Sequence, residues 1–295
     1  MFRRIFLFVI MNIAIIAMIS IALSVFNVQP YLTSYGLDYQ QLLIYSAIVG
    51  FTGSFFSLFL SKWMAKLAYK IEITHIPSSD REAEIIEIVK RLAHQGNITP
   101  PEVGIYDSPE INAFATGWSK NRALVAFSSG LLENMDSDEI EGVVGHEMSH
   151  ILNGDMLTMT LLQGILNTFV IFLARAAAYA LEAVLSKKDE ESSIGGLSYY
   201  LTSMVFEILF GLIASLLLFA FSRKREYRAD RSSADYLGRD KMIAALEKLS
   251  SLRERPLDHR GKSFATMKIS NRPSWNKIFS THPDLEDRIQ ALKKG

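Results

Sequence analysis

The chain has 295 residues, of which 49% are hydrophobic and 21% are charged, and its mean hydropathy is +0.17. This balance is too apolar for an ordinary soluble enzyme, and a formal net charge of zero gives no support to a nucleic-acid partner. Cysteine is absent, which excludes disulfides and thiolate metal sites, so any metal must be held by histidine and carboxylate side chains.

Two apolar runs near the start, residues 5–26 and 42–60, are long enough to cross a bilayer, which takes about 20 residues. Arginines precede the first run and lysines follow the second, whereas the link between them carries one charge, Asp38. By the positive-inside rule, both flanks are cytoplasmic and the link lies outside. We therefore expect residues 1–70 to form a pair of transmembrane helices. The alternative is a buried helical hairpin in a soluble core.

Residues 71–155 are more polar and predict the first part of a soluble domain. A capping box, Ser79 with Glu82, indicates a helix that ends near Gly96. Three β-rich runs follow, "PEVGIYD", "INAFATG" and "RALVAFSSG", and they predict a small sheet with tight turns.

A second apolar hairpin is expected within residues 156–221, with spans at about 156–185 and 197–221. A polar turn, "SKKDEESSIGG", separates the spans, and the basic "SRKREYR" follows on the cytoplasmic side. Arg175 and Glu207 interrupt the two spans at a similar depth below the turn, so their side chains could meet. A structural ion pair is the favoured interpretation, and a substrate or ion path is the alternative.

Residues 222–295 complete the soluble part, because neither this block nor 71–155 alone would build a comfortable core. Two helices separated at Gly238 and a closing helix, "PDLEDRIQALKK", are predicted here. Residues 256–279 show no clear period and stay unassigned, as a loop or a lid over a cleft. The predicted fold class is α+β for the soluble part and helical for the membrane part.

The helix before the second hairpin carries the motif H-E-x-x-H, with His146, Glu147 and His150. Asp136 or Ser137 caps this helix, and an Asn-Gly pair ends it. Histidines four residues apart project from one helix face, where two imidazoles can take neighbouring corners of a zinc tetrahedron. The glutamate lies close enough to water on such a metal to act as its general base. An exposed or otherwise satisfied histidine pair is the alternative, but apolar neighbours indicate that the helix is partly buried.

A catalytic zinc needs a third protein ligand. The candidates are the remaining histidines or a carboxylate, and the histidines are His75, His94, His259 and His282. Among carboxylates, Glu226 and Asp230 lie four residues apart on one helix face, so Glu226 could bind the metal while Asp230 hydrogen-bonds the outer nitrogen of a ligand histidine. If both spans of the second hairpin cross the membrane, Glu226 returns to the side of the H-E-x-x-H helix. An exposed acidic pair is the alternative.

These motifs together resemble the HtpX-type membrane zinc proteases of the M48 family. The H-E-x-x-H helix leads into a membrane hairpin, "EYRAD" follows that hairpin, and "INAFATG" lies upstream. The resemblance covers nearly the whole chain and implies a gluzincin-like fold with one zinc ion per chain. It also implies endopeptidase action on misfolded or damaged membrane proteins under stress, from the cytoplasmic face of a bacterial inner membrane. The implied partners are protein substrates and the lipid bilayer.

The resemblance also assigns roles by position. It makes His146, His150 and Glu226 the zinc ligands, Glu147 the base, and Asp230 the acid beside a ligand histidine. Asn112 and Ala113 match an edge strand that pairs with an extended substrate, which is β-augmentation. "THPDLEDRIQAL" resembles the family's closing segment, in which His282 or Arg288 would donate to the oxyanion of the reaction. For Arg288, a structural ion pair is the alternative.

A competing hypothesis is a non-hydrolytic membrane transporter or metal-binding scaffold. It predicts a closed metal site with four protein ligands and a function that does not depend on Glu147. The intact base, the carboxylate ligand and the predicted substrate strand favour a zinc metalloendopeptidase.

Overall fold

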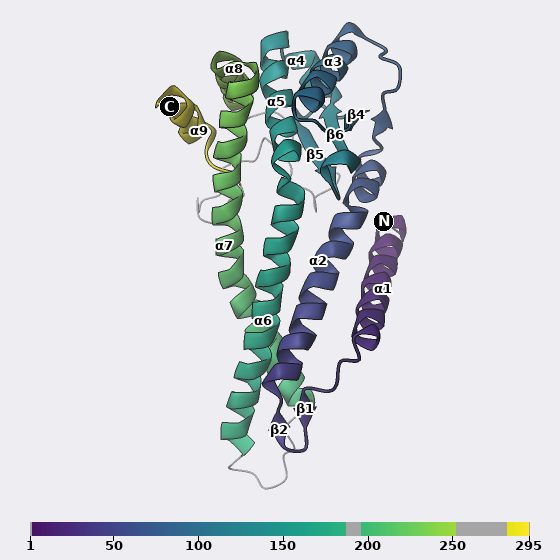
Figure 1. Ribbon diagram of the computed structural model, residues 1–295, viewed down its shortest axis with the longest axis vertical. Helices are drawn as coiled ribbons and strands as arrows, with labels where there is room; N and C mark the ends of the chain where they lie inside the picture. The colour runs from purple at the N-terminus through teal and green to yellow at the C-terminus, as the bar shows by residue number, and fades with distance from the viewer. Residues whose placement is uncertain (1, 187–195, 252–281, 295) are drawn as a thin grey trace. The chain divides into compact units, whose positions relative to one another are not determined.

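The structure is a computed structural model that describes residues 2–186, 196–251 and 282–294, with side chains from residue 13 onward (Figure 1). The helices are α1 (Phe2–Val25), α2 (Tyr39–Tyr69), α3 (Asp80–Gln95), the 3-10 helix η1 (Lys120–Arg122), α4 (Ser129–Asn134), α5 (Ser137–Asn153), α6 (Asp155–Ser186), α7 (Leu197–Leu237), α8 (Arg239–Ser251) and α9 (Leu285–Lys294). The strands are β1 (Leu32–Thr33), β2 (Gly36–Leu37), β3 (Glu72–Ile73), β4 (Glu102–Tyr106), β5 (Ala113–Gly117) and β6 (Ala123–Ser128).

The chain divides into two compact units. The first, which we call the apolar unit, contains Met1–Ser57 and Thr160–Leu218. The second, the sheet unit, contains Leu58–Met159 and Phe219–Gly295. The predicted fold class, a small mixed sheet with helices joined to long apolar helices, is confirmed.

Within the part of the chain that the structure describes, three helices are long and apolar enough to cross a membrane, α2, α6 and α7. The part of α1 whose side chains are described, Ile13–Val25, is a shorter apolar helix, so the first predicted span stays a prediction. The fourth predicted span and the segment "EYRAD" lie on one helix. Both belong to α7, which runs unbroken from Leu197 to Leu237.

Arg175 and Glu207 meet within the apolar unit as an ion pair. The Nε atom of Arg175 also donates to the hydroxyl of Tyr31 at 3.1 Å, and its guanidinium lies 5.4 Å from the ring centroid of Tyr45. Local partners therefore satisfy the arginine, as the structural interpretation of this pair expects.

The sheet of the sheet unit has the strand order β3-β4-β6-β5. Strands β4 and β6 are parallel, and the other pairs are antiparallel. Side chains of β6 alternate between two apolar clusters, with Val125 and Phe127 on one face and Leu124 and Ala126 on the other. Helices α3 and α5 cover the first face, whereas the last turns of α2 cover the second through Tyr69. The sheet thus fixes the position of α5.

Local signals set the ends of α3 and α5 where the sequence predicts them. The Ser79 side chain accepts from the backbone N–H of Glu82 and caps α3. Asp136 caps α5 in a reciprocal capping box with Glu139. Gly154 ends α5 with a left-handed φ of 70°, a conformation that glycine adopts without strain. Because α6 begins at the next residue, Asp155 lies beside the last turn of α5. The unassigned segment 256–279 lies outside the described residues.

Candidate metal centre

Helix α5 places His146, Glu147 and His150 in the interior of the sheet unit, where their exposed fractions are 1%, 3% and 8%. The two histidines lie one helical turn apart, and their Nε2 atoms are 3.2 Å from each other. The motif is therefore buried, and the Nε2 atoms of its two imidazoles converge.

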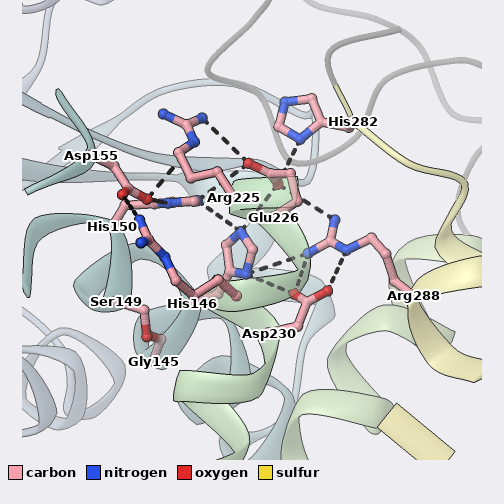
Figure 2. Close-up of polar contacts among 11 residues, drawn as sticks. Gly145, His146, Ser149, His150, Asp155, Arg225, Glu226, Asp230, His282 and Arg288 are labelled. Carbon is pink, nitrogen blue, oxygen red and sulfur yellow. Dashed lines mark hydrogen bonds and ion pairs between the residues drawn. The ribbon is translucent and has the colours of Figure 1, made fainter. Parts of the chain in front are cut away.

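Glu226 of α7 completes the group (Figure 2). Its Oε2 lies 3.4 Å from Nε2 of His146, and its Oε1 lies 3.4 Å from Nε2 of His150. Ligands about 2.0–2.2 Å from a tetrahedral zinc are separated from each other by about 3.3–3.6 Å, as the tetrahedral angle requires. The three residues therefore fit a zinc ion with little rearrangement and leave one corner open.

The alternative third ligands do not join this group. His75 and His94 are exposed, and His259 lies outside the described residues. Among the residues that the structure describes, the cluster able to hold a metal is His146, His150 and Glu226.

Small residues on α5 allow α7 and α8 to approach it closely. A Cβ atom on Gly142 would lie 2.5 Å from the carbonyl oxygen of Lys241 in α8, and one on Gly145 would lie 2.4 Å from Oγ of Ser233 in α7. The hydroxyl of Ser233 donates to the carbonyl of Gly142 at 3.0 Å. These contacts bring the carboxylate of Glu226 to the histidines.

Asp230, one turn beyond Glu226, lies behind His146. Its Oδ1 is 2.8 Å from Nδ1 of His146, the ring nitrogen that points away from the other ligands. The guanidinium of Arg288, from α9, holds the same carboxylate through two hydrogen bonds of 2.8 and 2.6 Å. Nη2 of Arg288 also lies 3.3 Å from Nδ1 of His146. When that nitrogen donates its proton to Asp230, both groups are donors, so they do not form a hydrogen bond with each other. The carboxylate therefore connects the ligand histidine to a buried arginine.

Burial and these neighbours determine the ionisation of His146 and Glu147. Burial alone would lower the pKa of His146, but hydrogen bonds to Asp230 and Glu226 outweigh it and raise the pKa to about 9. A metal at Nε2 must therefore displace a proton. Burial also raises the pKa of Glu147, although the nearby histidines partly offset this effect. A carboxyl with a raised pKa accepts a proton more readily at neutral pH.

Asp155 is a site residue that the sequence did not reveal. Its Oδ2 lies 2.7 Å from Nδ1 of His150, so each ligand histidine has a carboxylate at its outer nitrogen. Arg228 forms an ion pair with Asp155, and Nε of Arg225 lies 3.8 Å from it. The available signal was a charged residue directly after Gly154, at the start of an otherwise apolar helix.

His282 and Arg288 both reach the metal centre. Nδ1 of His282 lies 2.7 Å from Oε2 of Glu226, and 9% of the residue is exposed. Arg288 has no exposed surface, and its Nη1 is 3.9 Å from the same oxygen. The closing segment therefore contacts the carboxylate ligand through both residues.

Asn112 and Ala113 lie where β5 begins, and β5 is an edge strand that, among the described strands, pairs with β6 alone. The carbonyl of Asn112 accepts from the backbone N–H of Ser128, and its N–H donates to the Ser128 hydroxyl. The amide side chain of Asn112 donates to the hydroxyl of Tyr106. Because antiparallel pairs alternate, Ala113 and Ala115 direct their backbone groups to the open edge.

Comparisons with known proteins agree with this geometry. A model of peptidase family M48 matches residues 79–295. The protease HtpX homolog of Methylacidiphilum infernorum is 46% identical over 298 residues, covering 100% of this chain and 99% of the relative. Protease HtpX of Tolumonas auensis is 47% identical over 296 residues, and the protease HtpX homolog of Bacillus subtilis is 45% identical over 302 residues. Both cover 99% of this chain and 99% of their own length.

The fold also matches a solved structure, the crystal structure of S. mikatae Ste24p, with a TM-score of 0.62 at 15% sequence identity. The match covers 95% of this chain but only 62% of that protein, and at this identity it shows the fold alone. The family model, the full-length relatives and the cluster of His146, His150 and Glu226 identify the chemistry of the site. The chain belongs to peptidase family M48 and is a multi-pass membrane zinc metallopeptidase of the HtpX type.

Proposed function

We propose that this peptidase is an endopeptidase that cleaves misfolded or damaged membrane proteins, with Glu147 as its general base. The observation that carries the proposal is the position of Glu147 between the two ligand histidines, where burial raises the pKa of its carboxyl. Among the described residues no hydrogen-bond partner holds this carboxylate, so it remains available to a proton donor in the site.

Each residue of the site has a separate role in peptide hydrolysis. His146, His150 and Glu226 would hold the zinc ion, which when bound would supply polarisation of the scissile carbonyl and a water of lowered pKa. Glu147 takes the proton of the attacking water and returns it to the leaving amine. Asp230 holds the proton of His146 at Nδ1 and so keeps Nε2 directed at the metal.

An extended substrate would pair with the open edge of β5. The register directs the backbone N–H and C=O groups of Ala113 and Ala115 outward, whereas those of Asn112 are used by Ser128. Substrate backbone would bond first to Ala115, which is half-buried, because Ala113 has no exposed surface, and Asn112 would fix the start of the strand through Tyr106. This pairing requires a locally unfolded substrate, since a folded strand has its backbone groups already bonded.

His282 is the better candidate for the oxyanion donor. It keeps 9% exposed surface beside Glu226, whereas Arg288 has none and holds Asp230 with two hydrogen bonds. We infer that Arg288 positions Asp230, and through it His146, without contacting the substrate.

The proposed location is a bacterial inner membrane, with the sheet unit on the cytoplasmic side. Basic segments flank the apolar runs next to the sheet unit, including Lys62 and Lys66 on α2 and "SRKREYR" on α7. The metal centre would then act on chain segments that reach the cytoplasmic face.

The test compares substrate cleavage by three detergent-solubilised proteins: the parent, Glu147→Gln and a control, Glu133→Gln. The control changes an exposed carboxylate on α4. All are purified in chelator, given zinc and assayed for bound metal. The proposal expects equal zinc content, with cleavage of an unfolded soluble protein and of a destabilised membrane protein lost only in Glu147→Gln. Cleavage by Glu147→Gln at the parental rate would remove the assigned base. Cleavage of the soluble substrate alone would contradict the membrane-protein assignment.

A further inference from the structure

A loop that follows the edge strand carries an exposed aromatic side chain. Trp118 comes directly after β5, and 41% of its surface is exposed. Its ring stacks on that of Phe59 in α2, with ring centroids 5.4 Å apart and an angle of 30° between the planes. Phe59 is itself 58% exposed, so the stacked pair presents an apolar surface rather than a filled core.

The position of Phe59 along α2 sets the depth of this pair. Phe59 belongs to the apolar run 42–60, directly before the polar sequence that begins at Ser61. Trp63 lies one turn further on the same helix face and is 51% exposed. Since α2 is long and apolar enough to cross a membrane, Trp118 lies beside the last turn of a membrane span.

We propose that the loop Trp118–Arg122, together with Phe59 and Trp63, forms a contact surface that inserts into the headgroup layer of the bilayer. Tryptophan is enriched at this layer because its ring is apolar and its N–H is polar. The loop also exposes Lys120 and Arg122, whose charges suit lipid phosphates. The surface is continuous with the apolar face of α2, so lipid is the occupant that matches both its chemistry and its position.

The same loop is tied to the catalytic elements. Nζ of Lys120 donates to the carbonyl of Leu152 at 2.5 Å, two residues beyond the ligand His150. Nζ of Lys62 in α2 lies 3.5 Å from the carbonyl of Ala123, directly after the loop. The contact surface therefore holds both the open edge of β5 and the C-terminal end of α5 close to the membrane surface.

The contact surface would also favour membrane proteins as substrates, an inference that rests on the proposed function. An edge strand held at the headgroup layer meets chain segments where they emerge from the bilayer, before it meets soluble chains. Membrane proteins whose spans have loosened would supply such segments.

Tryptophan fluorescence tests the surface without reference to proteolysis. The chain has three tryptophans, so Trp63→Phe with Trp275→Phe leaves Trp118 as the single emitter. The protein is reconstituted in vesicles whose lipids carry fluorescence-quenching bromine atoms. The bromines lie either on the acyl chain near the glycerol or at the far end of the acyl chain. We expect stronger quenching by the shallow bromines than by the deep ones. Emission typical of solvated tryptophan, with no quenching by either lipid, would overturn the proposal.

A second measurement covers the case in which the double variant does not fold. The native chain lacks cysteine, so a single spin label can be placed at Ser119→Cys, with Glu133→Cys on α4 as the control. Oxygen concentrates in lipid, whereas a nickel complex stays in water. We expect oxygen to relax the spin label at Ser119→Cys more strongly than the nickel complex does, and we expect no such excess at Glu133→Cys. Equal, water-like accessibility at both positions would overturn the proposal.

Trp118→Ala separates this inference from the proposed function. The ratio of cleavage of a membrane-inserted substrate to cleavage of a soluble unfolded one, both in vesicles, should fall about tenfold, whereas Trp118→Phe should stay near the parental ratio. An unchanged ratio in Trp118→Ala would contradict the selection role. Absence of both cleavages in the parent would instead contradict the proposed function and leave the fluorescence result standing.

Discussion

Oδ2 of Asp155 lies 2.7 Å from Nδ1 of His150, and this contact joins the metal centre to the first residue of a candidate membrane span. Asp155 is fully buried, and Arg228 balances its charge. His146 has the equivalent contact with Asp230, so the two ligand histidines are oriented by carboxylates from different helices, α6 and α7. The metal centre therefore depends on where α6 begins as well as on α5.

Asp155→Asn is expected to weaken zinc binding about tenfold to a hundredfold, because an amide holds the His150 ring and supports its basicity less well. Chelator competition measures the affinity, and the absorption spectrum of the cobalt-substituted protein reports ligand geometry independently of cleavage. Asp235→Asn, at an exposed position on α7, is the matched control. Parental affinity and an unchanged cobalt spectrum in Asp155→Asn would show that the contact does not position His150.

The sequence predicted the central chemistry because that chemistry is local. The spacing of His146 and His150 and that of Glu226 and Asp230 are helical repeats, so each pair shares a helix face wherever the helices lie. The helix ends at Asp136 and Gly154 also follow from neighbouring residues. These features need no knowledge of tertiary packing.

The remainder depends on contacts that sequence order does not encode. Asp155 reaches His150 across the left-handed Gly154, the one residue between α5 and α6. Arg288 reaches Asp230 from a helix 58 positions later in the chain. Because arginine usually lies on the surface, the sequence does not indicate that Arg288 is buried. The outward direction of Ala115 depends on the register between β5 and β6.

Removing Asp230 should affect both metal binding and folding, because the buried Arg288 then loses its two hydrogen bonds and keeps only the 3.9 Å contact with Glu226. Asp230→Leu is expected to lower zinc affinity and to destabilise the protein by about 3–5 kcal/mol. Asp230→Leu combined with Arg288→Met should recover much of the stability but not the zinc affinity. Thermal unfolding and chelator competition separate the two effects. Recovery of zinc affinity in the double variant would mean that Asp230 does not act on His146.

Gly142→Ala should separate α5 from α8. The added methyl group would lie 2.5 Å from the backbone carbonyl oxygen of Lys241, which cannot move like a flexible side chain. We expect a loss of about 1–3 kcal/mol from overpacking, which exceeds the gain of up to about 1 kcal/mol in helix propensity. Gly211→Ala on α7 is the control, because nothing lies within 4 Å of its added Cβ. A stability of Gly142→Ala equal to that of the control would contradict the close packing.

Glu102 should give the sheet unit a pH-dependent stability. Its carboxylate lies 2.6 Å from Nζ of Lys66 and 2.9 Å from Nζ of Lys62. Burial opposes its ionisation, but the two ammonium groups outweigh burial and hold the pKa of Glu102 below its usual 4.5. The charged form is favoured by folding, so the stabilisation is complete above the unfolded pKa and disappears as the pH falls through the lower folded pKa.

Glu102→Gln should therefore be less stable than the parent near neutral pH, and the difference should vanish in acid below the folded pKa. The side chain is 41% exposed, so solvent screening limits the effect to about 1 kcal/mol or less, and added salt should reduce it further. Thermal unfolding midpoints across the acid range measure the difference, with Glu133→Gln as the control. A difference that persists or grows in acid would show that it does not arise from the charge of Glu102, because protonation removes the ion pairs.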